Sequence, residues 1–505
     1  MSLPAWLEPL LDAEAMRATD RWAIEDRGVP GAALMERAGA GLARVIAARA
    51  PSGRIAIACG KGNNGGDGLV AARLLREAGR EVDVLAVWPV DEFGPDAAEQ
   101  AARLPGAAPE AFAPEPLDGA TLVVDALLGT GFSGAPRDPA AAAIAAINAA
   151  GAPVVAVDVP SGVDASTGEV EGAAIEAVAT ATFHLAKPGL WIHPGKAHAG
   201  DVEVVAIGIP DGAPTETHLG LIARGVLDAV AHRGADSTKF SSGNVFVLGG
   251  SRGLTGAPAM SATAAQRSGA GYVTVAAPAP FESIFGVTLL EAMFVPLPES
   301  EGALAMDALD PALRAIERAN AVVLGPGFSK REGAQELART LAGAIPVPTV
   351  IDADGLNALA GRAGQLLGGR SAATVLTPHA GELGRLLGVD SKEIARSRLR
   401  HVRAAAAETR AVVVLKGDDT LIADPSGCVA VSPGGAPALA TAGTGDVLSG
   451  VIAALLAKGL DPFGAACAGV YAHLRAGQLA AAPHGPDGVI ASDVIARLPE
   501  AFARG

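Results

Sequence analysis

The feature that most constrains the fold of this chain is a repeated unit, a short apolar run that ends in a loop of glycines, acids or amides. The runs are 54–59, 122–125 and 154–158 in the first half, and 321–324, 349–351, 373–376 and 412–415 in the second. Short apolar runs between helical segments are typical of buried strands in parallel sheets. The sequence therefore predicts an α/β fold.

The loops that follow these runs predict where ligands bind. In an open parallel sheet, ligands bind beyond the carboxyl ends of the strands. Three successive strands of the first half end in polar loops, which a shared site explains better than helix capping does. In the second half, the side chains placed at this edge are Asp352, Asp354, His379, Glu382 and Lys416.

Each of these five side chains has more than one interpretation. Lys416 is a candidate phosphate contact, although a single lysine is often only solvated. The three acids could hold a hydrated magnesium ion or could have a structural role, and His379 could cap the helix that follows it. The spacing alone leaves these alternatives open.

The first glycine-rich loop, at 60–68, lies between a strand and a helix expected over 69–78. Backbone N–H groups of such a loop can cradle a phosphate. The loop fits G-x-G-x-x-G, but the next apolar run ends in Trp88 rather than the acid that a dinucleotide site needs. Its two asparagines and one aspartate supply hard oxygen ligands for a cation or a ribose, and a plain tight turn is the structural alternative.

The last glycine-rich loop, at 440–446, precedes a strongly apolar helix over 447–456 that Lys458 and Gly459 terminate. The free N–H groups and the positive dipole end of such a helix form an anion site. Asp446 could act there as a base beside a bound phosphate. It could also be only the N-cap of a buried helix.

The length of 505 residues predicts two or three domains. A turn-rich junction spans about 210–237, and a new series of strands starts at Asn244. The net charge of −15 argues against nucleic-acid binding. The most apolar long stretch, 140–157, contains Asn148, Gly151 and Pro153 and so predicts a helix and a strand, not a membrane span.

The cysteines and the N-terminal residues bear on the compartment. Cys59, Cys428 and Cys467 are far apart and form no CxxC pair, which favours a reducing compartment without disulfides or structural zinc. The first residues lack the pattern of a signal peptide. We expect a cytoplasmic protein that binds neither membranes nor nucleic acid and forms a homo-oligomer.

The motifs together resemble a known family. The stretches 376–383, 415–417 and 442–450 resemble the ribokinase-like dehydratase of NAD(P)H-hydrate repair, and 62–68, 124–131 and 157–164 resemble its partner epimerase. The combination resembles the bacterial bifunctional NAD(P)H-hydrate repair enzymes. The resemblance implies two three-layer α/β/α domains, a Rossmann-like epimerase at 1–222 and a ribokinase-like dehydratase at 223–505.

The implied activity is the repair of nicotinamide cofactors that have added water across a ring double bond. The epimerase would interconvert the R and S hydrates of NADH and NADPH, and the dehydratase would remove the hydroxyl from the S form at the expense of ADP. The resemblance implies potassium in the epimerase domain and magnesium with the nucleotide in the dehydratase domain.

In the first domain, the resemblance implies a site in the loops after three strands. The expected hydrate-binding residues are Asn63, Asn64, Gly65, Gly66, Asp67, Gly129, Thr130, Gly131, Phe132, Ser133, Gly134, Ala135 and Asp158. Potassium would be bound by Asn64, Asp125 and Ser161. Asp158 is the candidate acid–base, because epimerising a carbinolamine needs proton transfer at its hydroxyl or ring nitrogen.

In the second domain, the resemblance implies two adjacent subsites. The hydrate would contact Ala257, Gly327, His379 and Asp446, and the nucleotide would contact Lys416, Gly417, Asp418, Asp419, Thr420, Gly443, Thr444 and Gly445. Asp446 would deprotonate the ring hydroxyl for attack on the terminal phosphoryl group. The amides of the glycine loop would stabilise the transferring charge.

Two departures from the family pattern and three alternatives remain. Residues 239–245 depart from the usual His-Lys-Gly-Asp-Phe-Gly type of entry, and Gly355 stands where the family commonly has alanine.

The closest alternative is a ribokinase-like small-molecule kinase for a vitamin precursor, fused to a non-catalytic nucleotide-binding domain. A nicotinamide-dependent oxidoreductase and a non-catalytic binding module are weaker, since the first lacks its ribose-binding acid and the second leaves Asp67, Asp125 and Asp158 unexplained.

Overall fold

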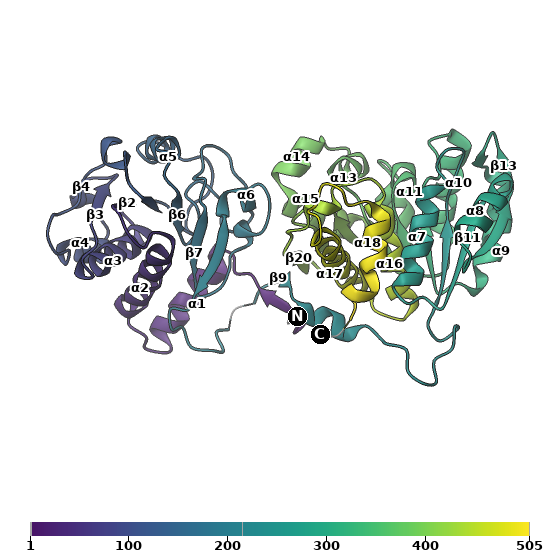
Figure 1. Cartoon of the computed structure of the whole chain (residues 1–505), viewed down its shortest axis with the longest axis horizontal. Coiled ribbons are helices and arrows are strands. Elements are labelled where there is room, and N and C mark those ends of the chain that lie inside the picture. The colour runs from purple at the N-terminus through teal and green to yellow at the C-terminus, as the bar shows by residue number, and fades with distance from the viewer. Residues whose placement is uncertain (1–2, 215, 504–505) are drawn as a thin grey trace. The chain divides into compact units, whose positions relative to one another are not determined.

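A computed structural model describes residues 3–214 and 216–503 of the chain. The chain forms two compact units, one of Pro9–Leu219 and one of Gly220–Gly505 together with Pro4–Glu8 (Figure 1). Within the described residues, no helix combines the length and the apolar character needed to cross a membrane.

The first unit is built on a seven-stranded sheet in which all paired strands are parallel. The strands are β2 (Ile55–Cys59), β3 (Val82–Ala86), β4 (Glu110–Ala111), β5 (Leu122–Ala126), β6 (Val154–Val157), β7 (Ala179–Phe183) and β8 (Asp201–Val205). Their order is β4-β3-β2-β5-β6-β7-β8, so the direction of winding reverses between β2 and β5. Such a reversal opens a crevice at the carboxyl ends of the two strands.

Helices cover both faces of this sheet (Figure 1). They are α1 (Ala13–Glu25), α2 (Gly31–Arg49), α3 (Asn63–Glu77), α4 (Pro95–Ala102), α5 (Ala140–Ala149) and α6 (Lys196–Ala199), with short 3₁₀ turns η1 (Val90–Glu92), η2 (Glu115–Leu117) and η3 (Pro188–Leu190). On one face, Leu42, Ile46 and Leu69 of α2 and α3 pack in a buried core. On the other face, Ile144 and Ile147 of α5 form a second core, so the three-layer prediction is confirmed for this unit.

The helix that we expected to start at Leu69 starts at Asn63, so three of the glycines assigned to a loop, Gly65, Gly66 and Gly68, belong to the first turns of α3. Glycine is a weak helix former, but close packing requires it here. A Cβ on Gly65 would lie 1.9 Å from the carbonyl oxygen of Gly60, and one on Gly68 would lie 2.7 Å from Ala126 Cβ. The glycines therefore let the start of α3 approach the ends of β2 and β5.

The second unit is built on an eleven-stranded sheet with the order β1-β9-β20-β19-β18-β17-β16-β15-β10-β11-β12. The strands are β1 (Leu7–Pro9), β9 (Leu219–Ile222), β10 (Asn244–Leu248), β11 (Tyr272–Pro278), β12 (Met293–Leu297), β15 (Ala321–Leu324), β16 (Thr349–Ile351), β17 (Thr374–Leu376), β18 (Val412–Leu415), β19 (Leu421–Ala423) and β20 (Val429–Val431). Pairs from β12 to β18 are parallel, and β18, β19 and β20 pair antiparallel. Winding reverses between β10 and β15.

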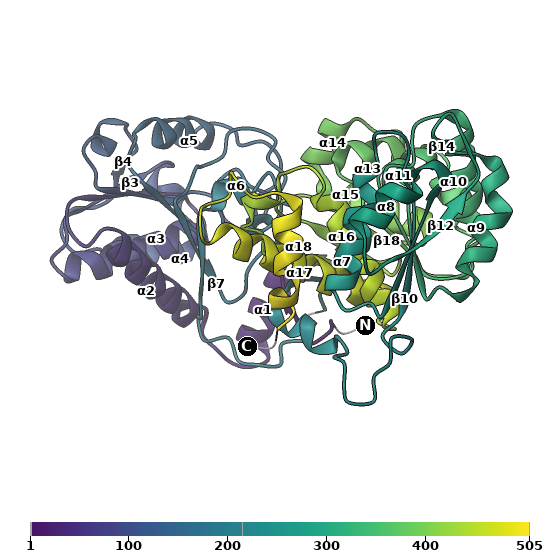
Figure 2. The same ribbon diagram turned by 45° about the vertical axis from the view of Figure 1, so that its right-hand side comes forward.

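Two groups of helices flank this sheet (Figure 2). One group is α7 (Gly256–Arg267), α16 (Thr444–Ala457), α17 (Pro462–Ala481) and α18 (Ala491–Ala501); the other is α9 (Leu309–Ala315), α10 (Glu332–Ala344), α11 (Asp354–Ala358), α12 (Ala363–Leu367), α13 (Ala380–Leu387), α14 (Ser391–Arg396) and α15 (Arg398–Thr409). At the far edge, α8 (Glu282–Thr288) packs on β12, and a small hairpin joins β13 (Glu299–Ser300) to β14 (Ala303–Leu304). The three-layer prediction is confirmed here too.

The second unit is not one continuous piece of chain. The strand β1 lies beside β9 at the edge of the sheet (Figure 1), and the backbone N–H of Ala223 donates to the carbonyl oxygen of Trp6 at 3.0 Å. The pattern of apolar runs did not indicate this pairing, because β1 is only three residues long.

Candidate functional sites

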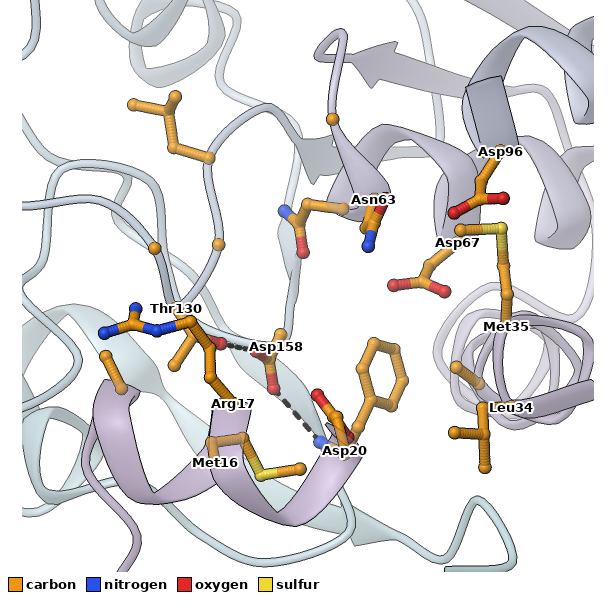
Figure 3. A pocket seen from close by; sticks show the side chains of 18 of the residues that line it. Met16, Arg17, Asp20, Leu34, Met35, Asn63, Asp67, Asp96, Thr130 and Asp158 are labelled. Carbon is orange, nitrogen blue, oxygen red and sulfur yellow. Dashed lines mark hydrogen bonds between the residues drawn. The ribbon is translucent and has the colours of Figure 1, made fainter. Parts of the chain in front are cut away.

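The first unit contains a cavity of about 680 Å³ beyond the carboxyl ends of β2, β5 and β6 (Figure 3). Its polar lining comprises Arg17, Asp20, Lys61, Asn63, Asn64, Asp67, Asp96, Thr130, Asp158 and Lys187. Apolar side chains of α1 and α2, among them Met16, Leu34 and Met35, line its other side. The cavity lies at the reversal of the sheet, as expected for an open α/β fold.

A buried ion pair lies at the bottom of this cavity. The ammonium of Lys187 is 2.5 Å from Asp158 Oδ1, and the side chains of Lys187 and Asp158 are 1% and 11% exposed. Lys187 also donates to Thr182 Oγ1 at 3.0 Å and to the carbonyl oxygen of Phe183 at 2.7 Å. Asp158 accepts from Thr130 Oγ1, Thr182 Oγ1 and the N–H of Phe183.

These contacts fix the charge state of Asp158. Burial alone would raise its pKa, but the ammonium of Lys187 and the hydrogen bonds from Thr130 and Phe183 outweigh burial and lower the pKa. Its backbone has a φ of 65°, which is uncommon for a residue with a side chain. Asp158 is therefore held rigidly as a carboxylate.

Two further carboxyl groups face the same cavity from α1 and α3 (Figure 3). Burial raises the pKa of Asp67 well above its usual range, and the charges of Asp158 and Asp20 raise it further. Burial also raises the pKa of Asp20 to about 6, although Lys187 acts in the opposite direction. Of the four carboxyls that line the cavity, which include Asp96, Asp158 is thus a fixed carboxylate, and Asp20 and Asp67 retain protons more readily.

Two of the residues expected to bind potassium, Asp125 and Ser161, are hydrogen-bonded to each other. Asp125 is fully buried and accepts from Ser161 Oγ at 2.6 Å, from the N–H of Ser161 at 2.8 Å and from the N–H of Leu127 at 3.2 Å. Burial raises the pKa of Asp125 to about 6 despite these bonds. The Nδ2 atom of Asn64 is buried without a hydrogen-bond partner, and a Cβ on Gly129 would lie 2.9 Å from Asn64 Oδ1. The donor set of amide, carboxylate and hydroxyl oxygens fits a hard cation.

The cavity brings together part of the expected hydrate site. Asn63, Asn64, Asp67, Gly129, Thr130, Gly131, Phe132 and Asp158 line it, whereas Gly65, Gly66, Ser133, Gly134 and Ala135 are not among its described lining residues. Sequence reasoning missed Lys187, Asp20 and Arg17. No local pattern marks them, because α1 resembles an ordinary amphipathic helix and a lysine in a loop is normally solvated.

The second unit presents its site at the first turn of α16. The helix starts after Gly443, whose φ is 92°, and no side chain caps it. Asp446 is the third helical residue, so its interpretation as an N-cap is wrong. The predicted end of the helix is confirmed, with Lys458 as C-cap and Gly459 at a φ of 89°.

Charged groups from three strand ends surround this turn. The ammonium of Lys416 lies 3.0 Å from Asp352 Oδ1 and 3.6 Å from Glu382 Oε2. Burial alone would lower the pKa of Lys416, but these two carboxylates outweigh it and raise the pKa. Ser449 Oγ donates to Asp352 Oδ2 at 2.6 Å. A Cβ on Gly445 would lie 3.4 Å from Lys416 Nζ, which places the ammonium beside the amides of the turn.

The environment of Asp446 suits a base that works near neutral pH. Burial and the charge of Asp352 raise its pKa to about 7, although the charge of Lys416 acts in the opposite direction. A general base is most effective when its pKa is close to the working pH. Asp446 is therefore the group of this site that can take up and release a proton under ordinary conditions.

A cavity of about 280 Å³ extends from this turn. It is lined by Lys416, Gly417, Asp418, Thr420, Ser432, Ala436, Pro437, Leu439, Ala440, Thr444, Gly445, Leu448, Val470, His473 and Leu474. Most of the expected nucleotide-binding residues are among them, but Asp419 and Gly443 are not. The carboxylate of Asp419 instead accepts from Arg398 Nε at 2.8 Å, in an ion pair with side chains 7% and 2% exposed.

The expected hydrate-binding residues Ala257, Gly327, His379 and Asp446 lie outside the described lining of this cavity. The capping alternative for His379 is confirmed, since its Nδ1 accepts from the N–H groups of Gly381 and Glu382 at the start of α13. Across the part of the chain that the structure describes, no group of three or more His, Cys, Asp or Glu side chains is arranged to hold a metal ion. Of the acids considered as magnesium ligands, Asp352 and Glu382 lie beside the ammonium of Lys416, and a magnesium role for them stays a prediction.

Family models match a large part of each unit. Residues 245–500 match the family model described as NAD(P)H-hydrate dehydratase, and residues 31–189 match the model described as YjeF-related protein N-terminus. A solved ADP/ATP-dependent NAD(P)H-hydrate dehydratase from Bacillus subtilis, co-crystallised with ATP and Mg²⁺, is 30% identical with a TM-score of 0.48 over 55% of this chain and 96% of its own.

Curated relatives match the chain almost from end to end. The bifunctional NAD(P)H-hydrate repair enzyme Nnr of Moorella thermoacetica is 41% identical over 97% of this chain and 96% of its own length. The protein of the same name from Escherichia coli is 36% identical over 96% of this chain and 92% of its own. The chain belongs to the family of bifunctional NAD(P)H-hydrate repair enzymes.

Proposed function

We propose that this chain repairs NADH and NADPH that have added water across a ring double bond. The first unit interconverts the R and S hydrates, and the second dehydrates the S form at the expense of ADP. The observation that carries the proposal is the nearly full-length match to bifunctional relatives, together with a separate polar cavity in each unit.

In the first unit, the cavity binds the hydrated nicotinamide ring of either epimer. Asn63 and the loop around Thr130 line the cavity and are available to hydrogen-bond the carboxamide and ribose. Potassium, where bound, would be held by Asn64, Asp125 and Ser161 and would supply fixed positive charge. The paired Lys187 and Asp158 keep the bottom of the cavity rigid.

In the second unit, Asp446 takes the proton of the ring hydroxyl, whose oxygen attacks the terminal phosphorus of ADP. AMP leaves, and the amides at the start of α16 with Lys416 stabilise the charge on the transferring group. The lone pair of the ring nitrogen then expels phosphate, and loss of a proton from the neighbouring carbon restores the double bond. Magnesium would be held chiefly by the phosphates of the nucleotide, whose charge it neutralises.

Three further parts of the proposal have their own support. The cysteines Cys59, Cys428 and Cys467 are free, which suits the cytoplasm. A homo-oligomer is supported by exposed apolar side chains at one edge of the second unit, where Val287 and Leu290 are 82% and 81% exposed. The functional division near residue 222 is supported by the end of the first unit at Leu219.

The function is tested with purified protein, hydrated NADH and ADP, by following the absorbance of reduced nicotinamide. We expect the S hydrate to be converted to NADH only when ADP is present, and the R hydrate to follow faster than it does by spontaneous epimerisation. Consumption of a nucleotide on a vitamin-precursor alcohol without recovery of NADH would instead identify a kinase and would contradict the proposal.

A further inference from the structure

We propose that Asp67, and not Asp158, carries the proton that epimerises the hydrate in the first unit, with the ion pair of Asp158 and Lys187 as its fixed counterpart. The inference rests on the proposed epimerase function and names the group that performs it. It follows from a comparison of the carboxyl groups that face the same cavity.

Asp158 is poorly suited to exchange a proton with a substrate. Its Oδ1 accepts from Lys187 at 2.5 Å, from Thr182 Oγ1 at 3.2 Å and from the N–H of Phe183 at 3.1 Å, while its Oδ2 accepts from Thr130. To receive a proton, the carboxylate would have to give up at least one of these bonds within a buried network. Hydrogen bonds to the charged form of an acid favour that form, so Asp158 remains ionised.

Asp67 has the opposite environment. It lies in the second turn of α3, its residue is 9% exposed, and none of the described residues donates a hydrogen bond to its carboxyl. Figure 3 shows this carboxyl facing the cavity. A buried carboxyl without a donor is costly as an anion and is stable as an acid. The direction of its pKa, well above the usual range, agrees with this geometry.

Asp20 completes the arrangement from α1. Figure 3 shows it on the side of the cavity where Asp158 lies. The cavity lining contains four carboxyls, those of Asp20, Asp67, Asp96 and Asp158, and three cations, Arg17, Lys61 and Lys187, of which Lys187 is paired with Asp158. The charges of Asp158 and Asp20 oppose ionisation of Asp67.

This charge distribution matches a specific reaction course. The protonated carboxyl of Asp67 donates its proton to the hydroxyl on the carbon beside the ring nitrogen. The C–O bond breaks, water leaves, and the nitrogen lone pair forms a C=N bond that carries a positive charge. Water then adds to the opposite face and returns one proton to the carboxylate of Asp67. Atoms and charge balance, and the carboxylates of Asp158 and Asp20 stabilise the cationic intermediate.

The test compares Asp67→Asn with wild type, starting from pure R hydrate and correcting for spontaneous epimerisation. We expect the R-to-S rate to fall by roughly 10²–10⁴-fold, the usual contribution of an acid–base group. Asp67→Glu should retain more activity than Asp67→Asn. The control is Asp91→Asn at an exposed position of η1, which should stay within about twofold of wild type.

The pH dependence separates a catalytic role from a structural one. The wild-type rate should fall as the pH rises through the pKa of Asp67, and the residual rate of Asp67→Asn should lack this decline. An Asp67→Asn rate within tenfold of wild type, or one that declines with pH as wild type does, would overturn the inference. Should Asp67→Asn fail to fold, a wild-type rate that is constant or rises with pH would overturn it as well.

The same chain reports on the proposed function independently. Dehydration of pure S hydrate with ADP depends only on the second unit and should be unchanged in all three variants. If wild type itself does not accelerate R-to-S conversion, the proposed epimerase function fails, and the role of Asp67 fails with it. If wild type does so and Asp67→Asn is equally fast, only the role of Asp67 is wrong.

Discussion

The ammonium of Lys187 lies 2.5 Å from Asp158 Oδ1, and neither side chain has more than slight contact with solvent. Each group makes the burial of the other tolerable, because an isolated charge in this environment would be very costly. The pair thus links the strand β7 to the loop after β6 at the bottom of the first cavity.

Removing one member of this pair should damage both stability and epimerisation. Lys187→Met leaves the carboxylate of Asp158 buried and unpaired, and loss of one partner from a buried pair costs roughly 3–5 kcal/mol. We expect a lower unfolding temperature for the first unit and slow R-to-S conversion, with normal dehydration of S hydrate. Calorimetry together with the two assays checks this, and an unchanged unfolding profile would contradict it.

Replacing Asp446, the proposed base of the second unit, should stabilise that unit. Asp446 has a pKa of about 7 in the folded chain, above the value of 3.8 expected when unfolded. The stabilisation by its bound proton is therefore complete below about pH 4 and is lost as the pH rises through 7. Above pH 7 the folded chain must hold Asp446 as a buried carboxylate, which lowers its free energy of unfolding. Asp446→Asn removes this cost and should raise the free energy of unfolding by up to about 4 kcal/mol at pH 8, and by less at pH 5.

The same variant should lose dehydration by roughly 10²–10⁴-fold, since no base remains at the ring hydroxyl. Thermal unfolding at several pH values and the ADP-dependent assay measure the two effects separately. A variant that is both fully active and no more stable than wild type would show that Asp446 neither carries the proton nor bears a desolvation cost.

The pair of Arg398 and Asp419 should control the shape of the loop at 416–420, which is expected to contact the nucleotide. Asp419→Asn leaves the guanidinium of Arg398 buried without its carboxylate, which costs roughly 3–5 kcal/mol. We expect a higher KM for ADP, because Arg398 also contacts the carbonyl oxygens of Leu415 and Lys416. Asp487→Asn, at an exposed position, is the matched control. Equal KM values in both variants would argue against this role.

A small change next to Asn64 should weaken potassium binding. The added Cβ of Gly129→Ala would lie 2.9 Å from Asn64 Oδ1 and would displace this proposed potassium ligand. Disturbed ligand shells typically cost roughly 10–100-fold in metal affinity, so half-maximal epimerisation should require correspondingly more K⁺. In Gly131→Ala the added Cβ meets no atom within 4 Å, so its potassium requirement should stay unchanged.

The sequence predicted the fold best where burial is continuous. The strands at Asn244–Leu248, Ala321–Leu324 and Val412–Leu415 have the expected bounds, because their buried residues between helical layers are all apolar. The strand β12 was missed because it contains Pro296 and lies on an edge, and β19 and β20 because three residues carry too little pattern.

The site was predictable only where a local pattern marks its residues. Asp158 and Asp352 were predicted because a polar residue after an apolar run is such a signal, and Asp446 because it lies between a glycine-rich loop and an apolar helix. Asp20 and Lys187 lack such a signal, since their role depends on which distant groups the fold brings to them. The charge state of each acid also depends on these tertiary neighbours, which composition and spacing do not encode.

The pairing of β1 with β9 affects how this chain can be synthesised and divided. The strand β1 leaves the ribosome first, but β9, the strand with which it pairs, lies more than 200 residues further along the chain. Protein synthesis adds about 5–20 residues per second, so β1 remains without its partner strand for on the order of ten seconds or longer while the first unit is synthesised. The edge of the second sheet is therefore completed late, and no single cut in the chain separates the two enzymes with all their strands intact.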